Sequence, residues 1–190
     1  AAEEELLVCH EIGHALYTPL DMLENSQLRK IDHSVVNVLE DARIEKKVKN
    51  KYLGTVRLFN AGYESLIKKD FFGTSGKDLS NYNLIDRINL FFKGNTDVVF
   101  SDEEKVWVDR TAKTETPDDV LDLAEELLAW MADNPESMGD PDESGDTDGE
   151  SMGDPADGSG STGEESGVGD TGDTGEESND KKEGKENGTS

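Results

Sequence analysis

Apolar side chains recur every three or four positions along most of residues 1–135, which is the spacing of one face of an α-helix. Convincing two-residue alternation, the mark of a half-buried strand, does not occur there, although residues 98–100 could form a short extended piece. Helices are predicted over residues 3–17, 32–48, 56–67 and 79–92, and two more begin near residues 101 and 116. The predicted fold class is mostly α, a compact domain of about six helices.

Three of these helices carry start signals. Asp32 is a good N-cap, because its side chain can accept a hydrogen bond from the first turn. Ser101 followed by Glu104 has the spacing of a capping box, and Thr116-Pro117 supplies an N-cap with a proline at the first helical position. Residues 56–67 predict either one bent helix or two short ones. Residues 71–76 predict a loop.

The composition of the chain changes near residue 135. The 190 residues carry a net charge of −25, and residues 136–190 contribute −15 of it, with 18 acidic residues, three lysines and no aromatic residue. Such a segment has too little apolar surface to offset its chain entropy. We therefore expect a disordered acidic Gly/Ser/Asp/Glu-rich linker or tail over residues 136–190, after one folded domain at residues 1–135.

Charge and cysteine content narrow the possible partners and compartment. A strongly acidic protein is repelled by nucleic acid and by anionic lipid, so neither is expected as a partner. No apolar run approaches the length of a membrane span, and no signal peptide is recognisable. Cys9 is the only cysteine, which fits a reducing, cytoplasmic location. Because the sequence starts at Ala1 inside a helix-forming stretch and without Met, we expect a truncated N-terminus.

The clearest chemical motif is His10-Glu11-Ile12-Gly13-His14, which has the H-E-x-x-H pattern of zinc hydrolases. Residues four apart lie on one face of a helix, so the rings of His10 and His14 can reach the same Zn²⁺ ion. Glu11 lies about 100° round the helix, where it remains available as a general base. The alternative is a pair of core histidines that are merely hydrogen-bonded.

A zinc site of this type needs a third protein ligand. The extended motif with a third histidine six residues after His14 is not present, because Tyr17 and Leu20 stand where its Gly and His would be. That excludes a metzincin arrangement. His33 is the remaining histidine, and a solvated position at a helix start is its simpler role.

Two adjacent acids in the second helix, Glu40 and Asp41, are better candidates, since charge in an apolar helical stretch needs compensation. Helical projection does not choose between them. Asp41 as ligand would place Glu45 four residues later, where it could orient a ligating histidine. Glu40 is longer and could reach across a helix pair. Ion pairing with Arg43 or a lysine is the purely structural alternative.

A family resemblance rests on these residues. The segments HEIGHALYTP and NVLEDARIEKKVKNKYLG resemble the metallopeptidase domain that precedes a von Willebrand factor A domain in some bacterial and tailed-phage proteins. NVLEDARIE is also similar to the matching helix of the cobaltochelatase T subunit. The likeness is closest over residues 10–60 and weaker to about residue 135. The acidic linker of such proteins resembles residues 136–190.

The resemblance implies a gluzincin-like site in which His10 and His14 bind zinc, Glu11 is the base, and Glu40 or Asp41 completes the ligand set. We favour Glu40, because a Leu-Glu-x-Ala-Arg core is what the two families share. It also implies a polypeptide substrate, the bacterial cytoplasm or the host cytoplasm of a phage protein, and a von Willebrand factor A domain beyond the C-terminus. This chain lacks the Asp-x-Ser-x-Ser motif of that domain.

Three functions follow as hypotheses. The first is a zinc metallopeptidase, with Tyr17, Tyr52 or Arg43 as an oxyanion donor. The second is a non-catalytic adaptor that zinc stabilises and that works with an AAA+ ATPase, as the T subunit does. The third is a helical interaction module without metal.

Overall fold

The computed structural model describes residues 2–140. It contains seven α-helices and two short 3₁₀ helices, and no strand occurs within this range. The mostly α prediction is confirmed. The elements are α1 (Ala2–Tyr17), α2 (Met22–Arg29), α3 (His33–Lys51), α4 (Thr55–Lys68), η1 (Leu79–Asn81), α5 (Leu84–Phe92), α6 (Asp102–Lys113), α7 (Pro117–Asp133) and η2 (Pro135–Met138).

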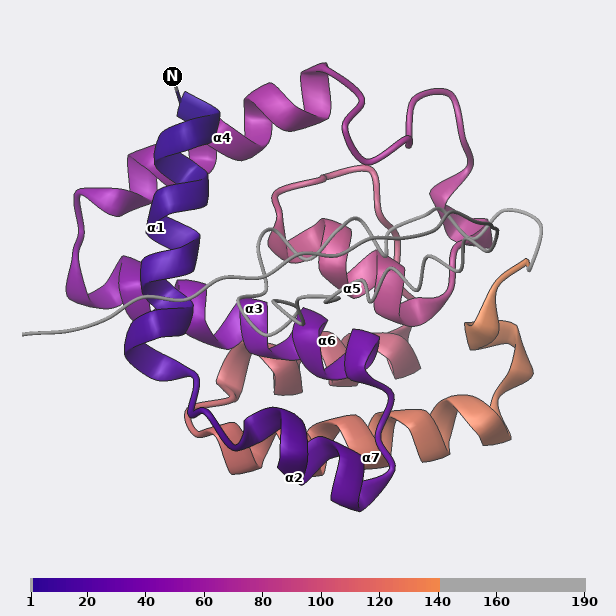
Figure 1. The fold of residues 1–190 in the computed structure, drawn as a ribbon. Coiled ribbons are helices and arrows are strands. Elements are labelled where there is room, and N and C mark those ends of the chain that lie inside the picture. Colours follow the sequence, from indigo (N-terminus) through magenta and orange to yellow (C-terminus); the bar gives the residue numbers. More distant parts are fainter. Residues whose placement is uncertain (1, 141–190) are drawn as a thin grey trace, which may run out of the picture. The chain divides into compact units, whose positions relative to one another are not determined.

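Helix α3 is the central element, and it contacts all six other α-helices (Figure 1). On one side its residues Val35, Val36 and Leu39 join the larger apolar cluster, which α2, α5, α6 and α7 complete. Further along, Val48 belongs to a smaller cluster with Leu6 of α1 and residues of α4. The acids of α3 therefore lie at the junction of two apolar clusters, in the part of the helix that faces α1.

The capping signals produce the predicted helix starts. Asp32 accepts a hydrogen bond from the backbone N–H of Ser34. Ser101 and Glu104 form the complete capping box. Thr116 caps α7, with Asp119 closing a second box that the sequence analysis did not identify. Short polar side chains at these positions satisfy N–H groups that have no partner inside the helix.

Several boundaries differ from the predictions. Residues 55–68 form one helix, α4, which decides between the two alternatives. The predicted helix over residues 79–92 divides into η1 and α5, because Asn83 is extended and caps α5 through Asp86 N–H. Residues 98–100 form no strand. Helix α2 was not predicted, and its apolar signal is weak, since only Met22 and Ser26 are buried in it.

Two glycines allow α1 to approach its neighbours closely. A Cβ atom on Gly62 of α4 would lie 2.5 Å from Leu6 Cβ, and one on Gly13 of α1 would lie 2.8 Å from Ile44 Cδ1 of α3. A larger residue at Gly62 would push α1 and α4 apart, whereas one at Gly13 would require the end of the Ile44 side chain to move. The glycine inside the H-E-x-x-H motif thus brings the motif against the acidic helix.

Contacts continue past the predicted domain boundary at residue 135. Ser137 is fully buried, and the backbone N–H of Asp140 donates to Asn81 O at 2.7 Å. The predicted disorder of the acidic segment falls mainly on residues 141–190, which lie outside the described residues. Among residues 2–140, no helix combines the length and apolar character needed to cross a bilayer.

Candidate metal centre

The crossing of α1 and α3 brings together His10, His14 and Asp41. His14 Nε2 lies 3.2 Å from His10 Nε2 and 3.1 Å from Asp41 Oδ1, and His10 Nε2 lies 3.6 Å from the same oxygen. His10 is 2% exposed, whereas the side chains of His14 and Asp41 are 21% and 18% exposed. Three potential ligand atoms thus converge at a partly open point.

These separations fit one small cation. Ligand bonds of about 2.0–2.1 Å in tetrahedral geometry place neighbouring ligand atoms about 3.3–3.4 Å apart. The observed separations of 3.1, 3.2 and 3.6 Å lie on both sides of that value. Two imidazole nitrogens and one carboxylate oxygen are also donors that zinc accepts. The group could therefore hold a divalent metal ion with little movement.

The opposite nitrogen of each ring is held by a polar side chain. His10 Nδ1 lies 3.1 Å from Glu45 Oε1, and His14 Nδ1 lies 3.0 Å from Thr18 Oγ1. Thr18 donates its hydroxyl hydrogen to Glu40 Oε1 at 2.6 Å, so its oxygen is available to accept from His14. If each Nδ1 carries the proton, each Nε2 presents a lone pair to the shared point. Such partners orient metal-ligating histidines.

Glu45 is the centre of a buried network on α3. Besides His10, it accepts hydrogen bonds from Tyr63 OH and, at 2.9 Å, from Lys49 Nζ. Burial acts to raise the pKa of Glu45, but the hydrogen bond with His10 and the Lys49 charge outweigh burial and lower it. Burial and the neighbouring carboxylate raise the pKa of Tyr63 well above its usual value, so Tyr63 stays a donor. Glu45 is therefore ionised at neutral pH.

Asp41 is ionised as well. Burial acts to raise its pKa, but the hydrogen bond with His14 and the charges of Lys93 and His10 lower it to about 2. Lys93 Nζ lies 3.4 Å from Asp41 Oδ2, on the oxygen that does not face the histidines. For His10, burial acts to lower the pKa, while Glu45 and Asp41 raise it above its usual value.

The preference for Glu40 as third ligand disagrees with this geometry. Both Glu40 oxygens are bound by Arg43, at 2.7 Å from Nε and 2.5 Å from Nη2, and the pair is almost fully buried. Arg43 also donates to the carbonyl oxygen of Tyr17. The structure therefore brings Asp41 into contact with His14. Glu40 instead contacts Thr18, which in turn contacts His14. The aspartate alternative, with Glu45 orienting His10, describes the observed contacts.

The other candidate residues, Glu11, His33 and the two tyrosines, lie on or next to α1 and α3. Glu11 is partly buried on α1, directly after His10. His33 is the first residue of α3 and its Nδ1 lies 3.1 Å from Asn37 Nδ2, so it is outside the metal group. Tyr17 ends α1, and Tyr52 follows α3 with a half-exposed side chain.

The residues that support the ligands, Thr18, Tyr63 and Lys93, were not predicted from the sequence. Thr18 could have been found, because it stands four residues after His14, directly after the end of α1, and its N–H still donates to His14 O. Tyr63 and Lys93 lie on α4 and just after α5, and no local pattern connects them with the motif. Only the packing of α4 and α5 beside α3 brings them to Glu45 and Asp41.

No family model matches the chain, and no curated protein or solved structure matches it either. What the site can do must therefore be inferred from its own residues.

Proposed function

We propose that the chain is a zinc-dependent, metallopeptidase-like hydrolase. The observation that supports it most is the convergence of His10 Nε2, His14 Nε2 and Asp41 Oδ1, with the outer nitrogen of each ring held by Glu45 or Thr18. The i, i+4 histidines with a glutamate between them are the pattern of enzymes that hydrolyse amide bonds.

The residues have distinct roles in this proposal. His10, His14 and Asp41 would hold the metal, and Glu45, Thr18, Glu40 and Lys93 would orient those ligands. When bound, zinc supplies Lewis acidity, which makes water acidic enough to lose a proton near neutral pH and polarises a carbonyl group.

The proton chemistry belongs to Glu11. Its carboxylate would accept the proton of the attacking water and return it to the nitrogen of the leaving amine. Arg43 is an unsuitable oxyanion donor, because its guanidinium already binds Glu40 and Tyr17 O. Tyr17 and Tyr52 remain as proposed donors.

The proposal extends to fold and family. We infer a zincin-like domain in which the motif helix packs on a carboxylate-bearing helix, of the type that resembles von Willebrand factor A-associated metallopeptidases and the cobaltochelatase T subunit. An AAA+ ATPase partner and a polypeptide substrate are part of the same proposal.

Elemental analysis combined with a peptidase assay tests this function. Purified protein should carry about one zinc per chain. H14A and D41A should lose most of the zinc, whereas E40A should keep it after correction for the folded fraction. Iron in place of zinc, or zinc loss in E40A but not in D41A, would overturn the assignment of metal or ligand.

E11Q separates catalysis from metal binding. It should keep zinc and lose hydrolysis of a quenched peptide library, with a fall of at least about 100-fold for a lost general base. A protein that binds zinc but shows no Glu11-dependent hydrolysis would favour the adaptor. A protein that binds no metal would leave only the interaction module.

A further inference from the structure

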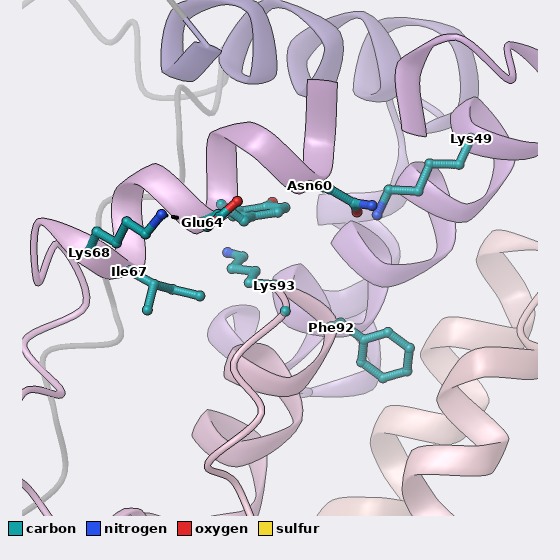
Figure 2. Close-up of a pocket in the computed structure, with 9 residues that line it drawn as sticks. Lys49, Asn60, Glu64, Ile67, Lys68, Phe92 and Lys93 are labelled. Atoms are coloured by element: carbon teal, nitrogen blue, oxygen red, sulfur yellow. Dashed lines mark hydrogen bonds and ion pairs between the residues drawn. The ribbon is translucent and has the colours of Figure 1, made fainter. Parts of the chain in front are cut away.

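A second feature of the surface lies next to residues that support the metal ligands. A cavity of about 330 Å³ opens between α4 and the end of α5, and Figure 2 shows Lys93 reaching from the end of α5 toward α4. Lys49 of α3 and Lys68 of α4 also line it. Tyr63 lines the same cavity and bonds to Glu45, which in turn contacts His10.

The residues that line this cavity include three lysines and one acid, Glu64, in a protein of net charge −25. Lys49 pairs with Glu45 at 2.9 Å. Lys68 bonds to Glu64 at 2.6 Å, and Lys93 contacts Asp41 at 3.4 Å. An ammonium group has three N–H donors. Each lysine can therefore bind a further acceptor without leaving its present partner.

The remaining lining residues suit an amphipathic group. The amide of Asn60 offers additional donors, and Ile67 and Phe92 are apolar members of the same lining. A short aliphatic stem that ends in a carboxylate matches this combination of apolar walls and cationic groups.

We propose that this cavity binds a carboxylate of the ligand that the neighbouring metal centre acts on, which makes the chain selective for peptides that present a side-chain or terminal carboxylate there. The carboxylate would be received by Lys68 and Lys93, with Asn60 as an additional donor. Carboxylate binding stands on the cavity alone, whereas its assignment to a peptide substrate rests on the proposed hydrolase function.

Replacing Lys68 can test ligand binding separately from charge compensation of the acids at the metal centre. Lys49 and Lys93 contact Glu45 and Asp41, so their positions could serve the metal centre alone. Lys68 contacts neither of these acids, and its side chain is 72% exposed. Its replacement should therefore leave the fold and the metal centre intact.

The test is a titration of the full chain with small carboxylates, followed by NMR of the backbone amides of Lys68 and Gly94. The probes are N-acetyl-glutamate amide, with a side-chain carboxylate, N-acetyl-glycine, with a terminal carboxylate, and inorganic phosphate. N-acetyl-glutamine amide is the neutral control. K68M is compared with K105M, because Lys105 also forms an exposed ion pair within its helix, with Asp102 at 2.8 Å.

We expect one or both carboxylates to bind, the neutral amide not to bind, and K68M to weaken binding about fivefold while K105M leaves it unchanged. The preferred carboxylate identifies its source. Equal binding of the neutral amide, tighter binding of phosphate, no binding, or no effect of K68M would overturn the proposal. Carboxylate binding together with an absence of hydrolysis would refute the hydrolase while leaving the anion site in place.

Discussion

His10 Nδ1 and Glu45 Oε1 lie 3.1 Å apart, and both side chains are less than 5% exposed. The contact joins the motif helix α1 to α3 inside the protein. Since Glu45 is ionised and also accepts from Tyr63 and Lys49, it is held firmly by three partners. It can therefore fix the orientation of the His10 ring.

Replacing Glu45 with Gln should weaken metal binding by about 10- to 100-fold, the range typical of partners that orient a ligand. The amide keeps the shape of the side chain but loses the charge that favours the Nδ1–H form of His10. Competition with a chromogenic chelator measures the affinity. E104Q is the matched control, because Glu104 is also a buried carboxylate, paired with Arg87 away from the histidines. Equal affinity in E45Q and wild type would contradict the role assigned to Glu45.

Loss of Arg43 should destabilise the fold. Its side chain and that of Glu40 are 2% and 3% exposed, and removing one partner of a buried ion pair leaves the other charge uncompensated. We expect R43M to lower the free energy of unfolding by about 3–5 kcal/mol, measured by denaturant titration. R110M should change it by at most about 1 kcal/mol, because the Arg110–Glu126 pair is largely exposed. Similar values for the two variants would refute this account.

The surroundings of Gly62 and Gly54 predict opposite effects on stability when each is replaced with Ala. G62A would place a Cβ atom 2.5 Å from Leu6 Cβ and should cost about 1–3 kcal/mol of unfolding free energy through overpacking. Gly54 has no atom within 4 Å of such a Cβ and has a φ of −62°. G54A should therefore be neutral or stabilising by up to about 1 kcal/mol. Thermal unfolding compares the two variants directly, and a harmless G62A would show that α1 can shift.

Low pH should lower the free energy of unfolding, partly because Glu104 becomes protonated. Burial acts to raise its pKa, but hydrogen bonds from the Arg87 guanidinium and the Ser101 N–H outweigh burial and lower it below the usual value of 4.5. A carboxylate with a lowered folded-state pKa adds stability above pH 4.5, and this stability is lost as the pH falls through the folded-state value.

The melting temperature of the wild type should therefore fall more steeply below about pH 4.5 than that of E104Q, which has no charge to lose there. E126Q serves as the exposed-pair control and should follow the wild-type profile. Parallel profiles for wild type and E104Q would contradict the prediction.

Most of the helices could be predicted from local sequence patterns. The caps at Asp32, Ser101 and Thr116 act within a few residues of themselves, so their signals survive without tertiary information. Helix α2 was missed for the converse reason, because it buries little and its pattern is therefore mostly polar.

The sequence by itself determined that His10 and His14 share one helix face, because a period of 3.6 residues requires it. It also placed acids on the next predicted helix. Only the tertiary structure decided which acid meets the histidines. At the crossing of α1 and α3, Gly13 packs close to Ile44, and Arg43 binds the Glu40 carboxylate. Such choices depend on packing between segments distant in sequence, which no local pattern encodes.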